Sequence, residues 1–217
     1  FYSNYNKILK YAISKTRSEN EIDKYIEKNN LNDKKKLLLH SCCGPCSSYV
    51  ISYLTKYFDI TILYYNPNIF PYDEYLKRKE EQIRLIKGLK TKNKLDYIDC
   101  DYENDKYEEA IKGLEKCIEG GNRCQICFKL RLEKTAQIAK LHNYDYFTTT
   151  LTVSPHKNAK IINEIGSSLE NIYNIKWLYA DFKKNEGYKQ SITLSKQYNL
   201  YRQNYCGCRY SKMPSSN

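Results

Sequence analysis

Cysteines are the residues of this 217-residue chain most able to do chemistry. Seven of the nine fall into three tight groups, which are Cys42-Cys43-x2-Cys46, Cys124-x2-Cys127 and Cys206-x-Cys208. An odd number of cysteines in such groups is unlike the disulfide framework of a secreted protein and favours metal binding or thiol redox chemistry. Cys100 and Cys117 stand alone, and we expect them to be structural because an isolated free cysteine behaves as a small buried hydrophobe.

The first group lies in a turn predicted to run from a buried strand into a helix, within the stretch LLLHSCCGPCSS. A helix N-terminus favours negative charge, so thiols here are biased toward the thiolate, which binds metals and attacks disulfides. One interpretation takes Cys43-Gly44-Pro45-Cys46 as a thioredoxin redox motif, but it leaves Cys42 and the other two groups without a role. The other interpretation makes Cys42 and Cys43 metal ligands. We do not expect ATP binding, because thiols stand where nucleotide-binding loops use small residues and backbone N–H groups.

The second group, Cys124 and Cys127, follows Gly120-Gly121 at a predicted helix start. Its spacing lets both sulfurs reach one metal centre, and together with Cys42 and Cys43 it would supply four thiolates. Four thiolates fit either a structural zinc ion or an iron–sulfur cluster. About eighty residues separate the two pairs, whereas a zinc ribbon closes a loop of about fifteen to twenty. The separation therefore favours a site built at the edge of a sheet.

The third group, Cys206-Gly207-Cys208, lies beyond the last predicted helix. Two cysteines separated by one residue can join only through a small strained ring, and strained disulfides are the labile, catalytic kind. A dithiol that becomes a disulfide releases two electrons and two protons. The competing interpretation makes these cysteines further ligands of the same metal.

Short apolar runs alternate with helical patterns and predict how these groups are positioned. Strands are predicted over 34–40, 59–66, 95–101, 144–150 and 175–182, and helices over 46–57, 72–88, 104–116, 124–141, 157–170 and 187–199. This alternation indicates an α/β fold, in which a mainly parallel sheet is flanked by helices on both faces. We expect a helical extension over residues 1–33, followed by one domain over 34–212 that includes a short cysteine-bearing C-terminal tail.

Charge and hydropathy restrict the partners and the location of the chain. The mean hydropathy of −0.75, with no long apolar run, excludes a membrane-spanning protein. The first residues lack the features of a secretory signal, so we expect a cytoplasmic protein. A net charge of +11 suits a polyanion such as RNA. The basic segment 76–94 is a candidate RNA-binding face, and a solvated amphipathic helix is the alternative; its cations are Lys77, Arg78, Lys79, Arg84, Lys87, Lys90, Lys92 and Lys94.

The three cysteine groups and the blocks between them resemble the epoxyqueuosine reductase QueH family (DUF208). Besides LLLHSCCGPCSSYV, the resembling stretches are YYNPNIFPYDEYLKRKEEQ, GNRCQICFKLRLEKTA, YDYFTTTLTVSPHKNAKIINEIG, YADFKKNEGYKQS and LYRQNYCGC, which span about Lys36 to Ser211. The resemblance implies a HUP-like fold, related to the PP-loop and adenine nucleotide alpha hydrolase-like folds. It also implies the last step of queuosine biosynthesis, in which epoxyqueuosine in the anticodon loop of tRNA loses its epoxide oxygen.

The same resemblance implies cofactors and site residues. A [4Fe–4S] cluster would be held by Cys42, Cys43, Cys124 and Cys127, and Cys206 and Cys208 would form the redox-active pair. An additional iron near the cluster is also implied, for which Asp101 at a strand end is a candidate ligand. Converting an epoxide to an alkene consumes two electrons and two protons and releases water, which matches what a dithiol pair supplies. The resemblance does not identify the electron donor.

Other polar residues lie near predicted strand ends, the side on which α/β sheets bind ligands. They are Asn66, Asn68, Thr148, Thr149, Thr150, Ser154 and His156. His156 would either contact the substrate or cap the following helix, and His40 would be structural or would support the cysteine loop. Three other functions stay open: an ATP-dependent iron–sulfur tRNA thiolase, an iron-free thiol–disulfide oxidoreductase that uses Cys43 and Cys46, and a non-catalytic zinc-stabilised RNA-binding domain.

Overall fold

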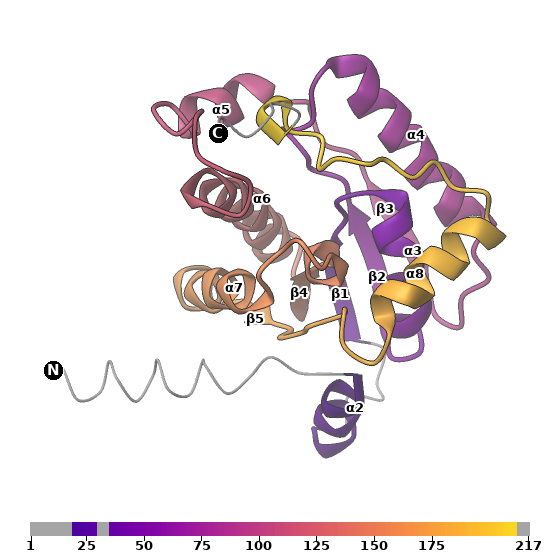
Figure 1. Cartoon of the computed structure of the whole chain (residues 1–217). Coiled ribbons are helices and arrows are strands. Elements are labelled where there is room, and N and C mark those ends of the chain that lie inside the picture. Colours follow the sequence, from indigo (N-terminus) through magenta and orange to yellow (C-terminus); the bar gives the residue numbers. More distant parts are fainter. Residues whose placement is uncertain (1–18, 30–34, 212–217) are drawn as a thin grey trace, which may run out of the picture.

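The computed structural model describes residues 19–29 and 35–211 and shows an α/β fold built on one five-stranded sheet (Figure 1). The strands are β1 Lys35–His40, β2 Phe58–Leu63, β3 Leu95–Ile98, β4 Tyr146–Thr149 and β5 Lys176–Trp177. They lie in the order β3-β2-β1-β4-β5, and every neighbouring pair is parallel. The predicted fold class, a parallel sheet between helices, is confirmed.

Helices cover both faces of this sheet, as Figure 1 shows, with α6 and α7 on one side and α3 and α8 on the other. The helices are α2 Glu19–Lys28, α3 Gly44–Leu54, α4 Tyr72–Gly88, α5 Asn104–Ala110, α6 Asn122–Leu141, α7 Ala159–Tyr173 and α8 Gly187–Gln197; short 3₁₀ turns are η1 Thr150–Val153 and η2 Arg209–Ser211. Because successive strand residues point to opposite faces, Leu37 and Leu39 join the core beneath α3, whereas Leu38 joins the core beneath α6. Among the helices of the described residues, none is both long and apolar enough to cross a membrane.

Helix α2 packs against the domain. Ile22 and Ile26 are fully buried in the core that contains β1, and the carboxylate of Asp23 accepts hydrogen bonds from the hydroxyls of Tyr53 and Tyr57. The part of the predicted helical extension that precedes α2 lies outside the described residues. The division of the chain at residues 33 and 34 therefore stays a prediction.

Several elements are shorter than their sequence patterns predict, and the difference is largest for α5 and β5. Helix α5 ends at Ala110 rather than near residue 116, and Gly113 in the following turns has a φ of +83°. Strand β5 covers two residues of the predicted 175–182 run. Beyond Trp177 the Leu178 N–H still donates to the β4 carbonyl of Phe147, but the backbone groups that follow bond to side chains. Thr148 Oγ1 donates to the Leu178 carbonyl, and the Asn163 side-chain amide bonds both the N–H and the carbonyl of Ala180.

Candidate active site

The strand order places a crevice at one end of the sheet. From β1 the chain crosses to β2 on one side, while β4 lies on the other side, so the connections at the carboxyl ends of β1 and β4 diverge. Ligands of open α/β sheets bind at this kind of switch point. Cys42 and Cys43 follow β1, and Thr150 follows β4. The backbone N–H of Cys42 donates to Thr150 Oγ1 at 3.1 Å, and that hydroxyl donates to Cys42 Sγ at 3.3 Å.

Three thiols converge in the turn after β1. Cys43 is the N-cap of α3, and the sulfurs of Cys42, Cys43 and Cys46 all lie within 4.8 Å of one another. Cys42 and Cys43 are buried, while Cys46 is half-buried. The sequence prediction paired Cys42 with Cys43 and gave Cys46 a role only in the thioredoxin interpretation. The structure instead groups Cys46 with both, because the first turn of α3 brings its side chain back over the loop.

The pKa values of these thiols are shifted in different directions. Hydrogen bonds from Cys43 and Cys46, together with the positive charge of Lys157, hold the pKa of Cys42 well below its usual range. The same hydrogen bond to Cys42 raises the pKa of Cys43 to about 11. A metal ion takes cysteine as thiolate and displaces such protons. Three buried or half-buried sulfurs beside a lysine are therefore a chemically suitable metal site.

The second group lies in the first turns of α6. Cys127 is buried and Cys124 is half-buried, and the backbone N–H of Gly120 donates to Cys124 Sγ at 3.2 Å. The guanidinium of Arg123 is buried and donates to backbone carbonyls of the preceding loop, including those of Glu115 and Cys117. This arginine fixes the loop that leads into the helix. Burial raises the pKa of both thiols, that of Cys127 to about 12, so a metal that binds here must displace their protons.

The third group sits where the tail crosses α4 and α5. Gly207 has a φ of +103°, its carbonyl accepts from the N–H of Phe70 at 2.9 Å, and Arg78 donates to the Cys206 carbonyl at 3.1 Å. Cys206 is half-buried, whereas Cys208 is buried and lies 3.0 Å from the hydroxyl of Tyr107. Burial raises the pKa of Cys208, and the hydrogen bond with Tyr107 opposes that rise.

Two adjoining cavities bring the three groups to one region. A small cavity of about 20 Å³ is lined by Cys124, Cys127, Cys206 and Cys208. A larger one of about 360 Å³ is lined by Cys42, Cys43, Cys46 and Cys206. Cys206, Arg131, His156 and Lys157 line both cavities. All six cysteines predicted to act therefore face the same region, although which of them bind a metal stays a prediction.

Sequence reasoning did not identify Arg131 and Lys157, the arginine and the lysine that line both cavities. Arg131 is 4% exposed and donates to Asn66 Oδ1 at 3.0 Å, and its Nε has no partner among the described residues. Burial works to lower the pKa values of Arg131 and Lys157, but the nearby cysteines outweigh it and raise both. Arg131 is four residues after Cys127 and so shares its helix face. That spacing was the available signal; Lys157 had none, because tertiary structure alone brings it near the cysteines.

The histidines and the candidate iron ligand occupy different positions. His156 is exposed and lines both cavities, but it does not cap α7: the side chain of Asn158 accepts from the N–H groups of Lys160 and Ile161. The alternative that His156 caps this helix is therefore wrong.

His40 is fully buried, 2.8 Å from Thr149 Oγ1, and burial together with the charge of Arg131 lowers its pKa to about 3. His40 is thus a neutral structural residue. Asp101 is exposed and lines neither cavity.

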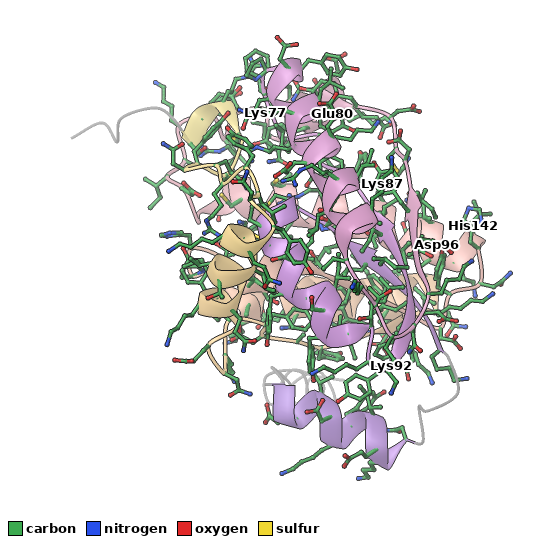
Figure 2. All side chains as sticks on the ribbon, turned by 90° about the vertical axis from the view of Figure 1, so that its right-hand side faces the viewer. Lys77, Glu80, Lys87, Lys92, Asp96 and His142 are labelled. Carbon is green, nitrogen blue, oxygen red and sulfur yellow. The ribbon has the colours of Figure 1, made fainter. Side chains whose placement is uncertain are left out.

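The basic segment 76–94 carries less unpaired positive charge than its sequence indicates. Four of its cations pair with carboxylates: Arg78 with Glu74, Lys79 with Asp99, Arg84 with Glu81, and Lys94 with Asp96. Arg78 is also buried. Figure 2 looks onto α4, where Lys77, Glu80 and Lys87 follow one another along the helix and Lys92 lies in the loop beyond. The mixture of charges fits the alternative, a solvated amphipathic helix.

Comparison with known proteins identifies a matching family and several similar proteins. A family model described as epoxyqueuosine reductase QueH matches residues 37–214. A protein of that name from Staphylococcus epidermidis is 44% identical over 97% of this chain and 85% of its own length. One from Streptococcus pyogenes is 43% identical over 82% of this chain and 71% of its own length. A third, from Thermotoga maritima, is 35% identical over 81% of this chain and 89% of its own length.

Proposed function

This chain belongs to the epoxyqueuosine reductase QueH family, and on that premise we propose that it reduces the epoxide of epoxyqueuosine in tRNA to the alkene of queuosine. The reaction consumes two electrons and two protons and releases water. Oxidation of Cys206 and Cys208 to a disulfide supplies both electrons. The observation that carries the proposal is the convergence of all three cysteine groups on two cavities that share Cys206.

The residues present fit an iron–sulfur cluster. Buried thiols from two elements face one region, and the cations Arg131 and Lys157 offset the negative charge that thiolate ligands bring. Cys42, Cys43, Cys124 and Cys127 would hold the [4Fe–4S] cluster, which would supply electron transfer and Lewis acidity next to the epoxide oxygen. Cys46 is then a fifth thiol at the same place. It is better positioned than Asp101 to bind an additional iron, because its sulfur lies among those of Cys42 and Cys43.

The larger cavity is suited to the modified nucleoside. At about 360 Å³ it is the size of a small-molecule site, and its lining includes Tyr188, Arg202 and Tyr205. Aromatic rings and cations are the groups that stack on unpaired bases and contact phosphates. An anticodon loop is single-stranded and presents its bases without opening a duplex. His156, exposed at the rim, is placed to donate a proton to the departing oxygen.

Specific contacts argue against the other functions. In a thioredoxin-type enzyme the first thiol of the motif must reach a partner disulfide, yet Cys43 is 2% exposed and its thiol is hydrogen-bonded to the thiol of Cys42. An ATP-dependent thiolase needs a phosphate cradle, and thiols fill the turn after β1 in its place. A zinc-stabilised RNA-binding domain gives no role to the tail cysteines, of which Cys206 lines both cavities and Cys208 lines the smaller one.

The test follows one oxygen atom. The chain is purified without oxygen, its iron, acid-labile sulfide and zinc are measured, and it is then incubated with epoxyqueuosine tRNA and a reductant. We expect iron and sulfide, and we expect mass spectrometry of the digested tRNA to show loss of one oxygen from the modified nucleoside. Iron-loaded protein that leaves the epoxide unchanged with several reductants would refute the proposal. Zinc as the only metal would refute the cluster.

A further inference from the structure

The two cysteines of the tail have different surroundings. Cys206 is half-buried and lines both cavities, including the larger open one. Cys208 is 4% exposed, lines only the smaller cavity, and packs with Tyr107 and Ile111 in a small apolar cluster. A molecule approaching from solvent therefore meets Cys206 first.

The hydrogen bonding of the two sulfurs differs as well. The hydroxyl of Tyr107, on α5, lies 3.0 Å from Cys208 Sγ, and the ring is 1% exposed. Within the described part of the chain, no side chain makes such a hydrogen bond to the sulfur of Cys206. A buried hydroxyl that has no competing water is well suited to stabilise a sulfur that becomes negatively charged.

Backbone contacts of the tail fix which of the two sulfurs is the more exposed. Arg78 donates to the carbonyls of Tyr205 and Cys206, and the Gly207 carbonyl accepts from the N–H of Phe70. These contacts hold Tyr205, Cys206 and Gly207 against α4 and the loop before it. The difference in exposure is thus a property of the fold rather than of a freely rotating tail.

From this asymmetry we propose that Cys206 is the sulfur attacked when the tail disulfide is reduced, that Cys208 is the leaving thiolate, and that Tyr107 donates the hydrogen bond that stabilises it. The inference rests on the proposed function, which makes these two cysteines the redox pair. Tyr107 acts here as a positioning residue, since it contacts Cys208 and not the substrate.

The exchange balances with a small dithiol as the reductant. One thiolate of the reductant forms a bond to Cys206 Sγ, the bond between the two tail sulfurs breaks, and its electron pair stays on Cys208 Sγ. The second thiolate of the reductant then displaces Cys206 and closes the reductant into a cyclic disulfide. Two electrons pass to the protein, and the two tail sulfurs take up the protons that the reductant loses. Leaving groups depart faster when their thiolate is stabilised.

The first experiment measures accessibility without needing turnover. Both tail cysteines fall in the tryptic peptide QNYCGCR, residues 203–209, so each is labelled alone in the single variants Cys206→Ser and Cys208→Ser. The native proteins are pulsed with a maleimide and that peptide is analysed by mass spectrometry. We expect Cys206, measured in Cys208→Ser, to be labelled at least about tenfold faster than Cys208, because burial excludes the reagent. Equal rates would overturn the assignment of the attacked sulfur.

The second experiment isolates the hydroxyl of Tyr107. The tail disulfide is formed by mild oxidation, and its reduction by dithiothreitol is followed in the native chain, in Tyr107→Phe and in the control Tyr102→Phe. Tyr102 also loses a hydroxyl, but the acceptor of that hydroxyl is the Ile69 carbonyl at 2.6 Å. We expect Tyr107→Phe to slow reduction about tenfold, the effect of losing one hydrogen bond to a charged sulfur, and we expect Tyr102→Phe to match the native rate.

The outcomes separate this inference from the proposed function. Suppose that the native chain forms the tail disulfide and reduces the epoxide, but that dithiothreitol reduces the disulfide of Tyr107→Phe at the native rate. The role of Tyr107 is then wrong, and the proposed function stands. If the peptide never carries a disulfide while the epoxide is still reduced, the redox pair itself is wrong and the inference fails with it. Thermal unfolding of Tyr107→Phe verifies that its fold is intact, and the labelling result holds without that variant.

Discussion

The carboxylate of Glu81 in α4 accepts a hydrogen bond of 2.5 Å from the backbone N–H of Tyr201, at the start of the tail. Arg84 pairs with the same carboxylate at 2.7 Å and donates to the carbonyls of Tyr198 and Asn199. One helix therefore fixes the end of α8 and the entry to the segment that carries Cys206 and Cys208.

This contact predicts acid sensitivity. The hydrogen bond from Arg84, with that from the Tyr201 N–H, lowers the pKa of Glu81 in the folded protein. Its stabilisation is therefore fully present above the unfolded pKa, near 4.5, and is lost as the pH falls through the lowered value. We expect Glu81→Gln to cost about 1 kcal/mol at pH 7 and progressively less toward pH 3. Urea unfolding across that range measures it, with the exposed neighbour Glu80→Gln as the control; a difference that stays constant with pH would contradict the prediction.

Metal content should depend on the second cysteine group. We expect Cys124→Ser and Cys127→Ser to lose most of the iron and sulfide of the anaerobically purified chain, because each removes a proposed ligand. Cys117→Ser is the matched control, since Cys117 lines neither cavity, and it should retain both. Retention of a full cluster by both ligand variants would disprove the proposed ligand set.

The tail pair should be needed for turnover but not for the metal. We expect Cys206→Ser to abolish thiol-dependent reduction of the epoxide and to keep the iron content of the native chain. Iron analysis and single-turnover assays on the same preparation test both statements. Should the variant lose its cluster, Cys206 is a ligand and the electron balance of the proposed function fails.

Gly207 should not tolerate a side chain. Its φ of +103° disfavours any other residue, and a Cβ there would lie 2.8 Å from Arg78 Nη1 and 3.0 Å from Ile69 Cγ1. We expect Gly207→Ala to destabilise the protein by about 1–3 kcal/mol. Gly113→Ala serves as the comparison, because Gly113 has a similar φ of +83° with no atom within 4 Å of its Cβ position. Thermal unfolding of both should show a larger loss at Gly207; equal losses would mean that the contact with Arg78 adds nothing.

Binding to tRNA should depend on the cavity rim more than on α4. Arg202 is exposed and lines the larger cavity, whereas Lys87 is exposed on α4. We expect Arg202→Glu to weaken binding and to reduce the slope of log K against log salt by about 1, the effect of one lost phosphate contact. Lys87→Glu makes the same change of charge and should have the smaller effect. If the two variants weaken tRNA binding equally in titrations at several salt concentrations, the result would support the predicted RNA-binding face over residues 76–94.

The fold could be predicted from the sequence because buried parallel strands are short continuous apolar runs, and the five runs stand out between charged helices. The strand predicted over 175–182 is longer than β5, and the reason for the difference is physical. Apolar composition reports burial, whereas a strand also requires a continuing row of backbone partners. After the Leu178 N–H, which bonds to Phe147, the side chains of Thr148 and Asn163 take the place of that row. Such long-range hydrogen bonds leave no local pattern.

The candidate site was predictable to the extent that spacing determines it. The cysteine spacings identified the groups, but the same Cys43-x2-Cys46 spacing suits a redox motif, so Cys46 was not assigned to the metal site. The position of Lys157 beside the cysteines and the contact of Arg78 with the tail depend on elements far apart in the sequence. Within α4, Arg78 and Arg84 pair with Glu74 and Glu81 at spacings that can be read from the sequence, whereas the pairing of Lys79 with Asp99 depends on the fold.

The shortness of β5 also affects how the molecule meets its neighbours. An edge strand with a row of free N–H and carbonyl groups is a template on which another chain can add a strand and begin aggregation. Here that edge offers two strand residues, one of them the exposed Lys176. The backbone that follows is already bonded to Thr148, Thr152 and Asn163. So short an edge strand, with an exposed lysine as one of its two residues, protects this edge against intermolecular strand addition.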